Sequence, residues 1–202
     1  MEYALTGGFS IIVIMFCIGY ISGAHINPSI TIALATVGQF PWCKVPFYVG
    51  VQLGASVLAA YVGKIVYDMP CDLAVTEPLG GIMRAFIAEF IATLFIMFLV
   101  SAIISNIHSI GWSSAFGFGA AVSLAVLITG PVSGGSLNPA RSFGPAIISE
   151  RFEDLWLYFV APTVGSIVGA FLFRLLQLEQ QTFYSLSANS SPTAQSVSEL
   201  RA

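Results

Sequence analysis

The amino-acid sequence predicts an all-α membrane protein built as an inverted repeat, with five full spans and two half-helices. Three observations predict this class. Apolar residues make up 56% of the 202 residues and charged residues only 8%, whereas soluble domains carry about 25% charged residues. Five apolar segments are long enough to cross a bilayer. One short motif occurs twice, 111 residues apart, at Asn27 and at Asn138.

Composition also excludes several function classes. The net charge is −3 and no basic block occurs, so we expect no nucleic-acid partner. The three cysteines have no metal-ligand spacing, so we expect no metal and no cofactor. Neither a zinc-protease motif nor a nucleotide-binding glycine loop is present, and the sequence therefore predicts no enzymatic activity.

The five predicted spans follow from helix geometry. A helix rises 1.5 Å per residue, so crossing about 30 Å of hydrocarbon takes about 20 apolar residues. The segments that qualify are 3–21, 45–66, 83–105, 112–129 and 155–176. Small residues recur in these segments and predict close helix contacts. They are Gly50, Gly54, Ser56, Gly63, Gly117, Gly119, Gly165 and Gly169.

Two shorter apolar stretches, 28–37 and 139–148, are predicted to be half-helices. Each is about ten residues long, or about 15 Å as a helix, which is half a bilayer. Each begins with Asn-Pro, and Asn is a preferred N-cap while Pro is a preferred first helical residue. Irregular backbone at membrane depth is tolerated where it lines a cavity or is packed in protein.

The repeat explains the order of these segments. Residues 22–28 match residues 133–139, and each copy has the order span, half-helix, span. The span 83–105 precedes the second copy, which therefore enters from the opposite side of the membrane. Subtracting the same offset of 111 from the position of Glu89 gives a position before residue 1. The first copy therefore lacks a counterpart of that span. Either the chain is a fragment or the protein functions with five spans.

We expect the channel domain to cover residues 1–178. Residues 179–202 are rich in Ser, Gln and Thr and are predicted to form a disordered polar tail.

The duplicated motif predicts a pore. Two half-helices that meet at mid-membrane bring two positive dipole ends together. Each Asn carboxamide can cap its helix through oxygen and offer N–H groups to the lumen. Such a site holds a small neutral molecule by hydrogen bonds and repels cations. The predicted pore-motif residues are Asn27, Pro28, Ser29, Asn138, Pro139 and Ala140.

Three further polar residues lie in or beside the predicted membrane segments. An arginine in the bilayer marks a function, and we expect Arg141 both to define a filter and to be tied to backbone carbonyls. We expect Glu89 to accept hydrogen bonds from backbone N–H groups of a loop rather than to take part in transport. We expect His25 to hold the first loop rather than to act as a pH-sensitive group.

The motifs at 22–29 and 135–142 resemble those of the major intrinsic proteins, the aquaporin family, and the similarity extends over residues 3–178. Ala88-Glu89-Phe90 is similar to the motif of the helix that opens each repeat in that family. The family has six spans, so the resemblance implies that the first is missing here. Segments 38–49, 128–135 and 152–156 resemble the plant nodulin-like intrinsic proteins (NIP). Ser29, where most members have Ala, suits the metalloid-carrying branch of that subfamily.

The resemblance also implies a selectivity filter, formed by Gly7, Val126, Gly135 and Arg141. Three of these are small or aliphatic, which is typical of channels for boric and silicic acid. The implied function is passive flow of boric acid or other metalloid acids, glycerol and urea, with modest water flux. The implied assembly is a homotetramer in lipid, in the plasma membrane rather than an internal one. The alternative is a truncated, non-conducting subunit that acts by assembling with full-length relatives.

Overall fold

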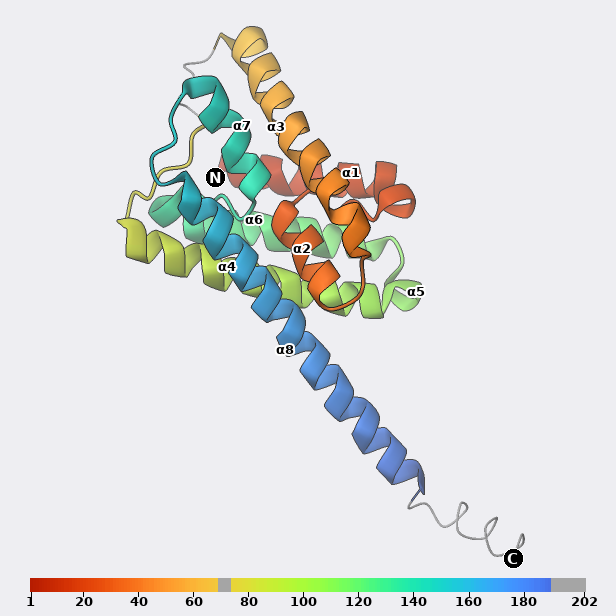
Figure 1. Cartoon of the computed structure of the whole chain (residues 1–202). Coiled ribbons are helices and arrows are strands. Elements are labelled where there is room, and N and C mark those ends of the chain that lie inside the picture. The colour runs from red at the N-terminus through yellow and green to blue at the C-terminus, as the bar shows by residue number, and fades with distance from the viewer. Residues whose placement is uncertain (69–73, 190–202) are drawn as a thin grey trace, which may run out of the picture.

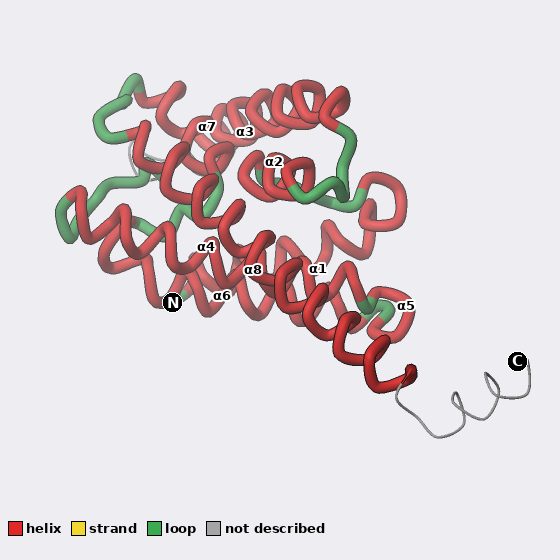
Figure 2. Tube along the Cα trace, turned by 60° about the horizontal axis from the view of Figure 1, so that its bottom comes forward, coloured by secondary structure: helices red, strands yellow, loops and turns green. Residues whose placement is uncertain are grey.

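A computed structural model describes residues 1–68 and 74–189 of the chain. Within these ranges the fold consists of helices and loops without a strand (Figure 2). The five long helices are α1 (Glu2–Ser22), α3 (Val45–Tyr67), α4 (Ile82–Ser105), α6 (Ser113–Ser133) and α8 (Leu155–Asn189). All five contain a stretch that is long and apolar enough to cross a membrane. The predicted five-span, all-α fold is therefore confirmed.

The two half-helices are also present, as α2 (Pro28–Thr36) and α7 (Pro139–Ser149). The sequence reasoning missed two short elements, the helix α5 (Ile107–Ile110) and a single 3₁₀ turn at Trp42–Lys44. Both lie in connections, where few residues are available to form a periodic pattern.

The end of α8 differs from the sequence-based expectation. The helix continues past Leu178 to Asn189, whereas a disordered tail was expected from residue 179. The segment 179–189 contains neither Pro nor Gly and begins with Glu and Gln, which are good helix formers. Figure 1 shows the blue end of α8 projecting away from the other helices. Residues 190–202, the rest of the expected tail, lie outside the described residues.

The packing of the half-helices joins the two repeats. α2 packs mainly against α8, the last span of the other repeat, and α7 packs mainly against α3. The other main contacts are made between α1 and α6, between α4 and α8, and between α4 and α6. Each half-helix is thus held in place by the repeat to which it does not belong.

Glycine allows close approach of the backbones where α1 meets α6 and where α4 meets α8. A Cβ atom on Gly8 would lie 2.4 Å from the carbonyl oxygen of Gly119. A Cβ atom on Gly165 would lie 2.3 Å from the carbonyl oxygen of Phe90, and one on Gly169 would lie 2.2 Å from that of Leu94. These glycines cannot carry a side chain without moving a helix.

Other glycines that the sequence suggested as contact points have open space around them. They are Gly50, Gly54, Gly63 and Gly117. A Cβ atom on any of them would have no atom of another part of the structure within 4 Å. Three of the four lie on α3, which presents an uncovered apolar surface that includes Val51 and Leu58. In the second repeat the corresponding helix, α8, is covered by α4, and the described part of the first repeat has no helix in that place.

Candidate functional site

The half-helices α2 and α7 begin with the same capping geometry. The Asn27 side-chain Oδ1 accepts a hydrogen bond from the Ser29 backbone N–H at 2.9 Å. Asn138 Oδ1 accepts one from the Ala140 backbone N–H, also at 2.9 Å. Pro28 and Pro139 are the first helical residues, where a missing N–H costs nothing. Each asparagine oxygen is therefore used as a helix cap.

The two asparagines also connect the repeats directly. Asn27 Nδ2 donates to the carbonyl oxygen of Leu137 at 2.8 Å. Asn138 Nδ2 donates to the carbonyl oxygen of Ile26 at 3.1 Å. A carboxamide nitrogen carries two hydrogens, so each asparagine keeps one for another acceptor. The sequence reasoning did not anticipate that the other hydrogen is used between the loops.

Ile26 and Leu137, the acceptors of these bonds, have left-handed backbone conformations. Their φ angles are 56° and 58°, values that large or β-branched residues rarely adopt. Such a conformation costs on the order of 1–3 kcal/mol and persists only where the surroundings hold it. Here the opposing asparagine donates to the carbonyl oxygen of each strained residue.

Glu89 is fully buried on α4 and accepts three hydrogen bonds from the second loop. Its Oε1 accepts from the Ser133 hydroxyl at 2.6 Å and from the Ser136 backbone N–H at 2.8 Å. Its Oε2 accepts from the Leu137 backbone N–H at 2.6 Å. These donors lie at the end of α6 and in the loop that leads into α7, so the carboxylate holds the backbone next to Asn138.

Two tyrosines brace the two loops in the same way. The buried Tyr158 hydroxyl donates to the carbonyl oxygen of Ser133 at 2.8 Å. The Tyr48 hydroxyl donates to the carbonyl oxygen of Ser22 at 3.1 Å. Ser22 and Ser133 are equivalent in the sequence repeat, but the tyrosines are one position out of register with it. A search for residues at the repeat offset therefore misses this pair.

Arg141 lies in the first turn of α7, and one guanidinium nitrogen donates to the carbonyl oxygen of Ala74 at 2.7 Å. Arg141 lines a cavity of about 650 Å³ together with Gly7, Val126 and Gly135. Asn27 and Asn138 line the same cavity. The structure thus brings the four residues of the predicted filter to one cavity, next to both asparagines.

Gly135 and Val126 are direct neighbours in this cavity. A Cβ atom on Gly135 would lie 3.1 Å from Val126 Cγ1 and 3.4 Å from the Val126 carbonyl oxygen. The φ angle of Gly135 is 64°, which favours glycine on its own account. Gly7, in contrast, has no atom within 4 Å of the place where a Cβ atom would lie, so the cavity is open beside it.

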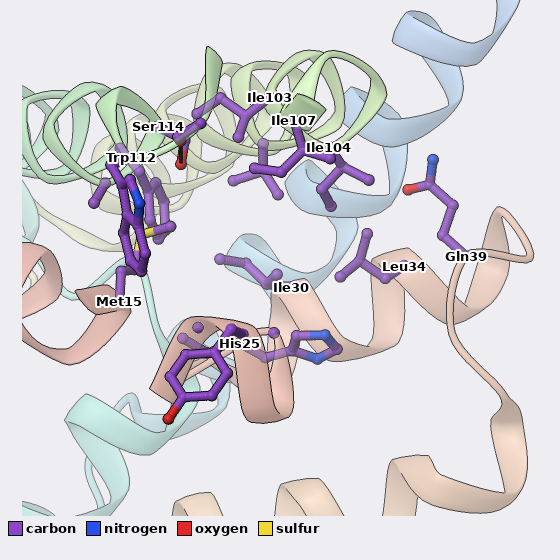
Figure 3. Close-up of a pocket in the computed structure, with 18 residues that line it drawn as sticks. Met15, His25, Ile30, Leu34, Gln39, Ile103, Ile104, Ile107, Trp112 and Ser114 are labelled. Carbon is purple, nitrogen blue, oxygen red and sulfur yellow. Dashed lines mark hydrogen bonds between the residues drawn. The ribbon is translucent and has the colours of Figure 1, made fainter. Parts of the chain in front are cut away.

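A second cavity of about 470 Å³ lies beside the first half-helix loop, where Gly23, Ala24 and His25 line it (Figure 3). It shares His25, Ile30 and Phe118 with the first cavity. The two cavities therefore meet at these residues. Taken together they outline a path past the loops that carry Asn27 and Asn138.

Ser29 and Ala140 do not line either cavity. Ser29 is fully buried, and its hydroxyl lies 3.0 Å from the Thr163 hydroxyl of α8. The Ala140 carbonyl oxygen accepts a hydrogen bond from the Ser56 hydroxyl of α3. These two motif residues attach the half-helices to the spans of the opposite repeat.

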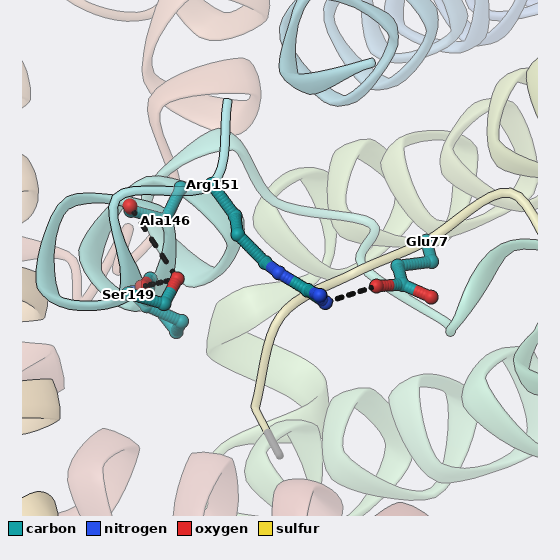
Figure 4. A network of polar contacts seen from close by, with 5 residues as sticks. Glu77, Ala146, Ser149 and Arg151 are labelled. Atoms are coloured by element: carbon teal, nitrogen blue, oxygen red, sulfur yellow. Dashed lines mark hydrogen bonds and ion pairs between the residues drawn. The ribbon is translucent and has the colours of Figure 1, made fainter. Parts of the chain in front are cut away.

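The segment after residue 74 covers the cavity that contains Arg141. The Thr76 hydroxyl donates to Ser142 Oγ at 2.8 Å, and the Gly80 backbone N–H donates to the Val132 carbonyl oxygen at 2.8 Å. Figure 4 shows the third contact, between Glu77 and Arg151, whose charged atoms lie 2.9 Å apart. This ion pair is about half exposed, so it contributes little on its own.

The fold and this path define a class of protein, a membrane channel built on an inverted repeat with paired half-helices. Among the described residues no group of three or more His, Cys, Asp or Glu could hold a metal ion. Comparison with known proteins agrees with this class. The family model for the major intrinsic proteins matches residues 1–173. The chain therefore belongs to the major intrinsic protein family and is an integral, multi-pass membrane protein.

The relatives place it further, among the NIP aquaporins. The chain is 45% identical over 201 residues to the probable aquaporin NIP7-1 of Arabidopsis thaliana, covering 99% of this chain and 71% of that protein. It is 38% identical over 178 residues to aquaporin NIP6-1 of the same plant, covering 88% of this chain and 58% of that protein. The chain thus spans little more than half of the second relative. The expected NIP type is confirmed.

A solved structure confirms the fold. The X-ray structure of the aquaglyceroporin from Plasmodium falciparum superimposes with a TM-score of 0.76 at 23% sequence identity. The match covers 84% of this chain and 79% of that one.

Proposed function

We propose that this channel passes boric acid or other metalloid acids, glycerol and urea, with modest water flux. The observation that carries the proposal is the set of residues at the larger cavity, where Gly7, Val126 and Gly135 leave room beside Arg141. None of the three has a side chain larger than valine. A solute wider than water can therefore pass the arginine.

Hydrogen bonding at this level selects for neutral, oxygen-bearing solutes. One N–H of Arg141 is bound to Ala74, which fixes the guanidinium and leaves other donors for the solute. The remaining N–H of Asn27 and of Asn138 provides further donors along the path. The arginine charge and the positive ends of two half-helices oppose the passage of cations.

Glu89 is proposed to be structural, and His25 is proposed to support the first loop. The two carboxylate oxygens of Glu89 accept hydrogen bonds from three donors, at Ser133, Ser136 and Leu137. His25 contacts Thr31 of the first half-helix and packs against the rings of Phe40 and Tyr48. Both side chains thereby hold the loops that carry the asparagines.

The proposal is tested by solute uptake into proteoliposomes that contain the purified chain. We expect boric acid and glycerol uptake above that of empty liposomes, with a smaller gain in water permeability. Uptake equal to that of empty liposomes, for protein shown to be folded, would overturn the proposal. Arg141→Ala serves as a selectivity control, since it should admit cations that the native chain excludes.

A second candidate function is favoured by the uncovered face of α3. Gly50 and Gly54 have open space around them, and Val51 and Leu58 are exposed. On this alternative the chain does not conduct alone and acts by assembling with full-length relatives. Flux measured for the chain alone, and again after co-expression with a full-length NIP aquaporin, separates the two functions.

Assembly and location complete the proposal. We propose a homotetramer in which each protomer has its own pore, located in the plasma membrane. Mass measurement of the detergent-solubilised protein and membrane fractionation test these two statements.

A further inference from the structure

The hydroxyl group of Thr31 lies at the centre of a small buried network. It donates to the carbonyl oxygen of Asn27 at 3.0 Å. The side-chain amide of Gln52 lies 3.1 Å from it, and so does Nδ1 of His25. Thr31 itself is fully buried, so these groups complete the hydrogen bonding of its hydroxyl without water.

Counting hydrogens assigns the role of each group. A hydroxyl has one hydrogen and two lone pairs. A carbonyl oxygen can only accept, so all three contacts can be hydrogen bonds at once only when the hydrogen of Thr31 goes to Asn27. Gln52 must then present its NH₂ group, and His25 must present an N–H at Nδ1. The oxygen Oε1 of Gln52 then points away from Thr31 and is buried without a partner among the described residues.

The surroundings of His25 favour a neutral ring. The imidazole packs against the Phe40 and Tyr48 rings, with centroids 4.7 Å and 5.2 Å away. Within the described residues no carboxylate forms an ion pair with it. It also lies close to the N-terminus of α2, where the helix dipole disfavours a positive charge. A neutral imidazole protonated at Nδ1 carries a lone pair at Nε2.

The position of His25 puts this lone pair on the path. His25 lines both cavities and lies two residues before Asn27, and Figure 3 shows its ring at the smaller cavity. A Cβ atom on Gly23 would lie 3.2 Å from Nε2. Glycine at this position therefore leaves the nitrogen uncovered. No described residue forms a hydrogen bond with Nε2.

We propose that His25 is a specificity-determining residue of the pore, held as the Nδ1–H tautomer so that Nε2 accepts hydrogen bonds from permeating hydroxyl groups. The inference rests on the proposed flow of hydroxylated solutes. Arg141 and the two asparagine amides offer donors to such a solute, and boric acid and glycerol also carry O–H groups that need acceptors. Thr31 and Gln52 act as positioning residues, because they fix which nitrogen carries the proton.

The tautomer can be read directly by nitrogen NMR of the full chain labelled with ¹⁵N-histidine. The chain has two histidines, so His108→Gln leaves His25 as the single signal. We expect Nδ1 in the protonated range and Nε2 in the unprotonated range of shifts. A signal protonated at Nε2, or at both nitrogens, overturns the proposal.

Two hydroxyl variants of α2 make the assignment specific. Thr31→Val removes the acceptor for Nδ1–H and should shift the signal toward the other tautomer. Thr36→Val is the matched control, because the Thr36 hydroxyl donates to the Ala33 carbonyl oxygen at 2.7 Å and does not contact His25. An unchanged His25 signal in Thr31→Val contradicts the network.

Flux measurements test the role toward the solute. His25→Phe keeps a ring but removes the acceptor, and boric acid and glycerol flux should fall roughly 2- to 10-fold, the equivalent of one hydrogen bond. His25→Gln offers both an N–H to Thr31 and an oxygen to the lumen, and should keep flux within about twofold of native. If the native chain conducts and His25→Phe shows no loss of flux, this inference alone is overturned. No flux in the native chain overturns the proposed function instead.

Discussion

Asn27 of the first half-helix donates to the carbonyl oxygen of Leu137 in the opposite loop at a nitrogen–oxygen distance of 2.8 Å. The reciprocal bond from Asn138 to Ile26 makes the two loops interdependent. Both acceptors have positive φ angles, so each strained residue is held by the asparagine of the other repeat. The asparagines are therefore structural links between the repeats as well as lining residues of the larger cavity.

The first prediction concerns this link. Asn138→Ala removes the cap on the Ala140 N–H and the bond to Ile26, and should destabilise the chain by about 2–3 kcal/mol. Asn27→Ala should cost a similar amount. Because the two bonds support the same pair of loops, the double variant should differ from the sum of the single variants. Thermal unfolding in detergent measures all three, and strictly additive losses would contradict the coupling.

The second prediction concerns Glu89. In Glu89→Gln one carboxylate oxygen becomes an NH₂ group, which cannot accept a hydrogen bond from the donors that face it. The variant should therefore destabilise the chain by about 2–4 kcal/mol. Glu153→Gln is the control, since Glu153 is exposed and should change stability by less than about 0.5 kcal/mol. Unfolding of both variants in detergent is the measurement. Equal stability of the two variants would show that Glu89 does not hold the second loop.

The sequence predicted the elements of this fold because each has a local signal. Apolar length predicts the spans, and Asn followed by Pro predicts each half-helix, so α2 and α7 were located to within a residue or two. The partners of the loops have no such signal. Tyr158, Tyr48 and Thr31 are common residue types in apolar helices, and only their position in space brings them to the loops.

Two predictions from composition were wrong, one about the end of α8 and one about the glycines of α3. The Ser, Gln and Thr content after Leu178 suggested disorder, but the absence of Pro and Gly up to Asn189 allows α8 to continue. Ser56 on α3 makes the expected close contact with α7, but the glycines of α3 also suggested helix contacts, and a contact requires a second helix. The glycines of α8 have α4 beside them, and Gly50 and Gly54 of α3 do not have an equivalent neighbour among the described residues.

The third prediction concerns Ser29, which was assigned to the pore by its motif. Its hydroxyl points to Thr163 on α8 and it lines neither cavity. Ser29→Ala should therefore leave the ratio of boric acid to water flux unchanged, while costing about 1 kcal/mol of stability. Thr163→Val should behave in the same way. A changed solute ratio in either variant, measured in proteoliposomes, would place the hydroxyl pair in the permeation path.

The last prediction concerns Val126, which lies beside Gly135 in the cavity that Arg141 lines. Valine offers only apolar contact there, so Val126→His adds a bulkier, polar ring and narrows the opening. Boric acid and glycerol flux should fall more than water flux, because steric exclusion depends on solute width and water still fits in single file.

Arg141→Ala should have the opposite effect on selectivity, since it widens the same opening and removes the charge that excludes cations. Leu124→His on the same helix is a matched control for Val126→His, because Leu124 is exposed and does not line either cavity. Solute and water permeabilities of the three variants in proteoliposomes provide the measurement. If Val126→His leaves the solute-to-water ratio as it is in Leu124→His, Val126 is not at the constriction and the filter assignment is wrong.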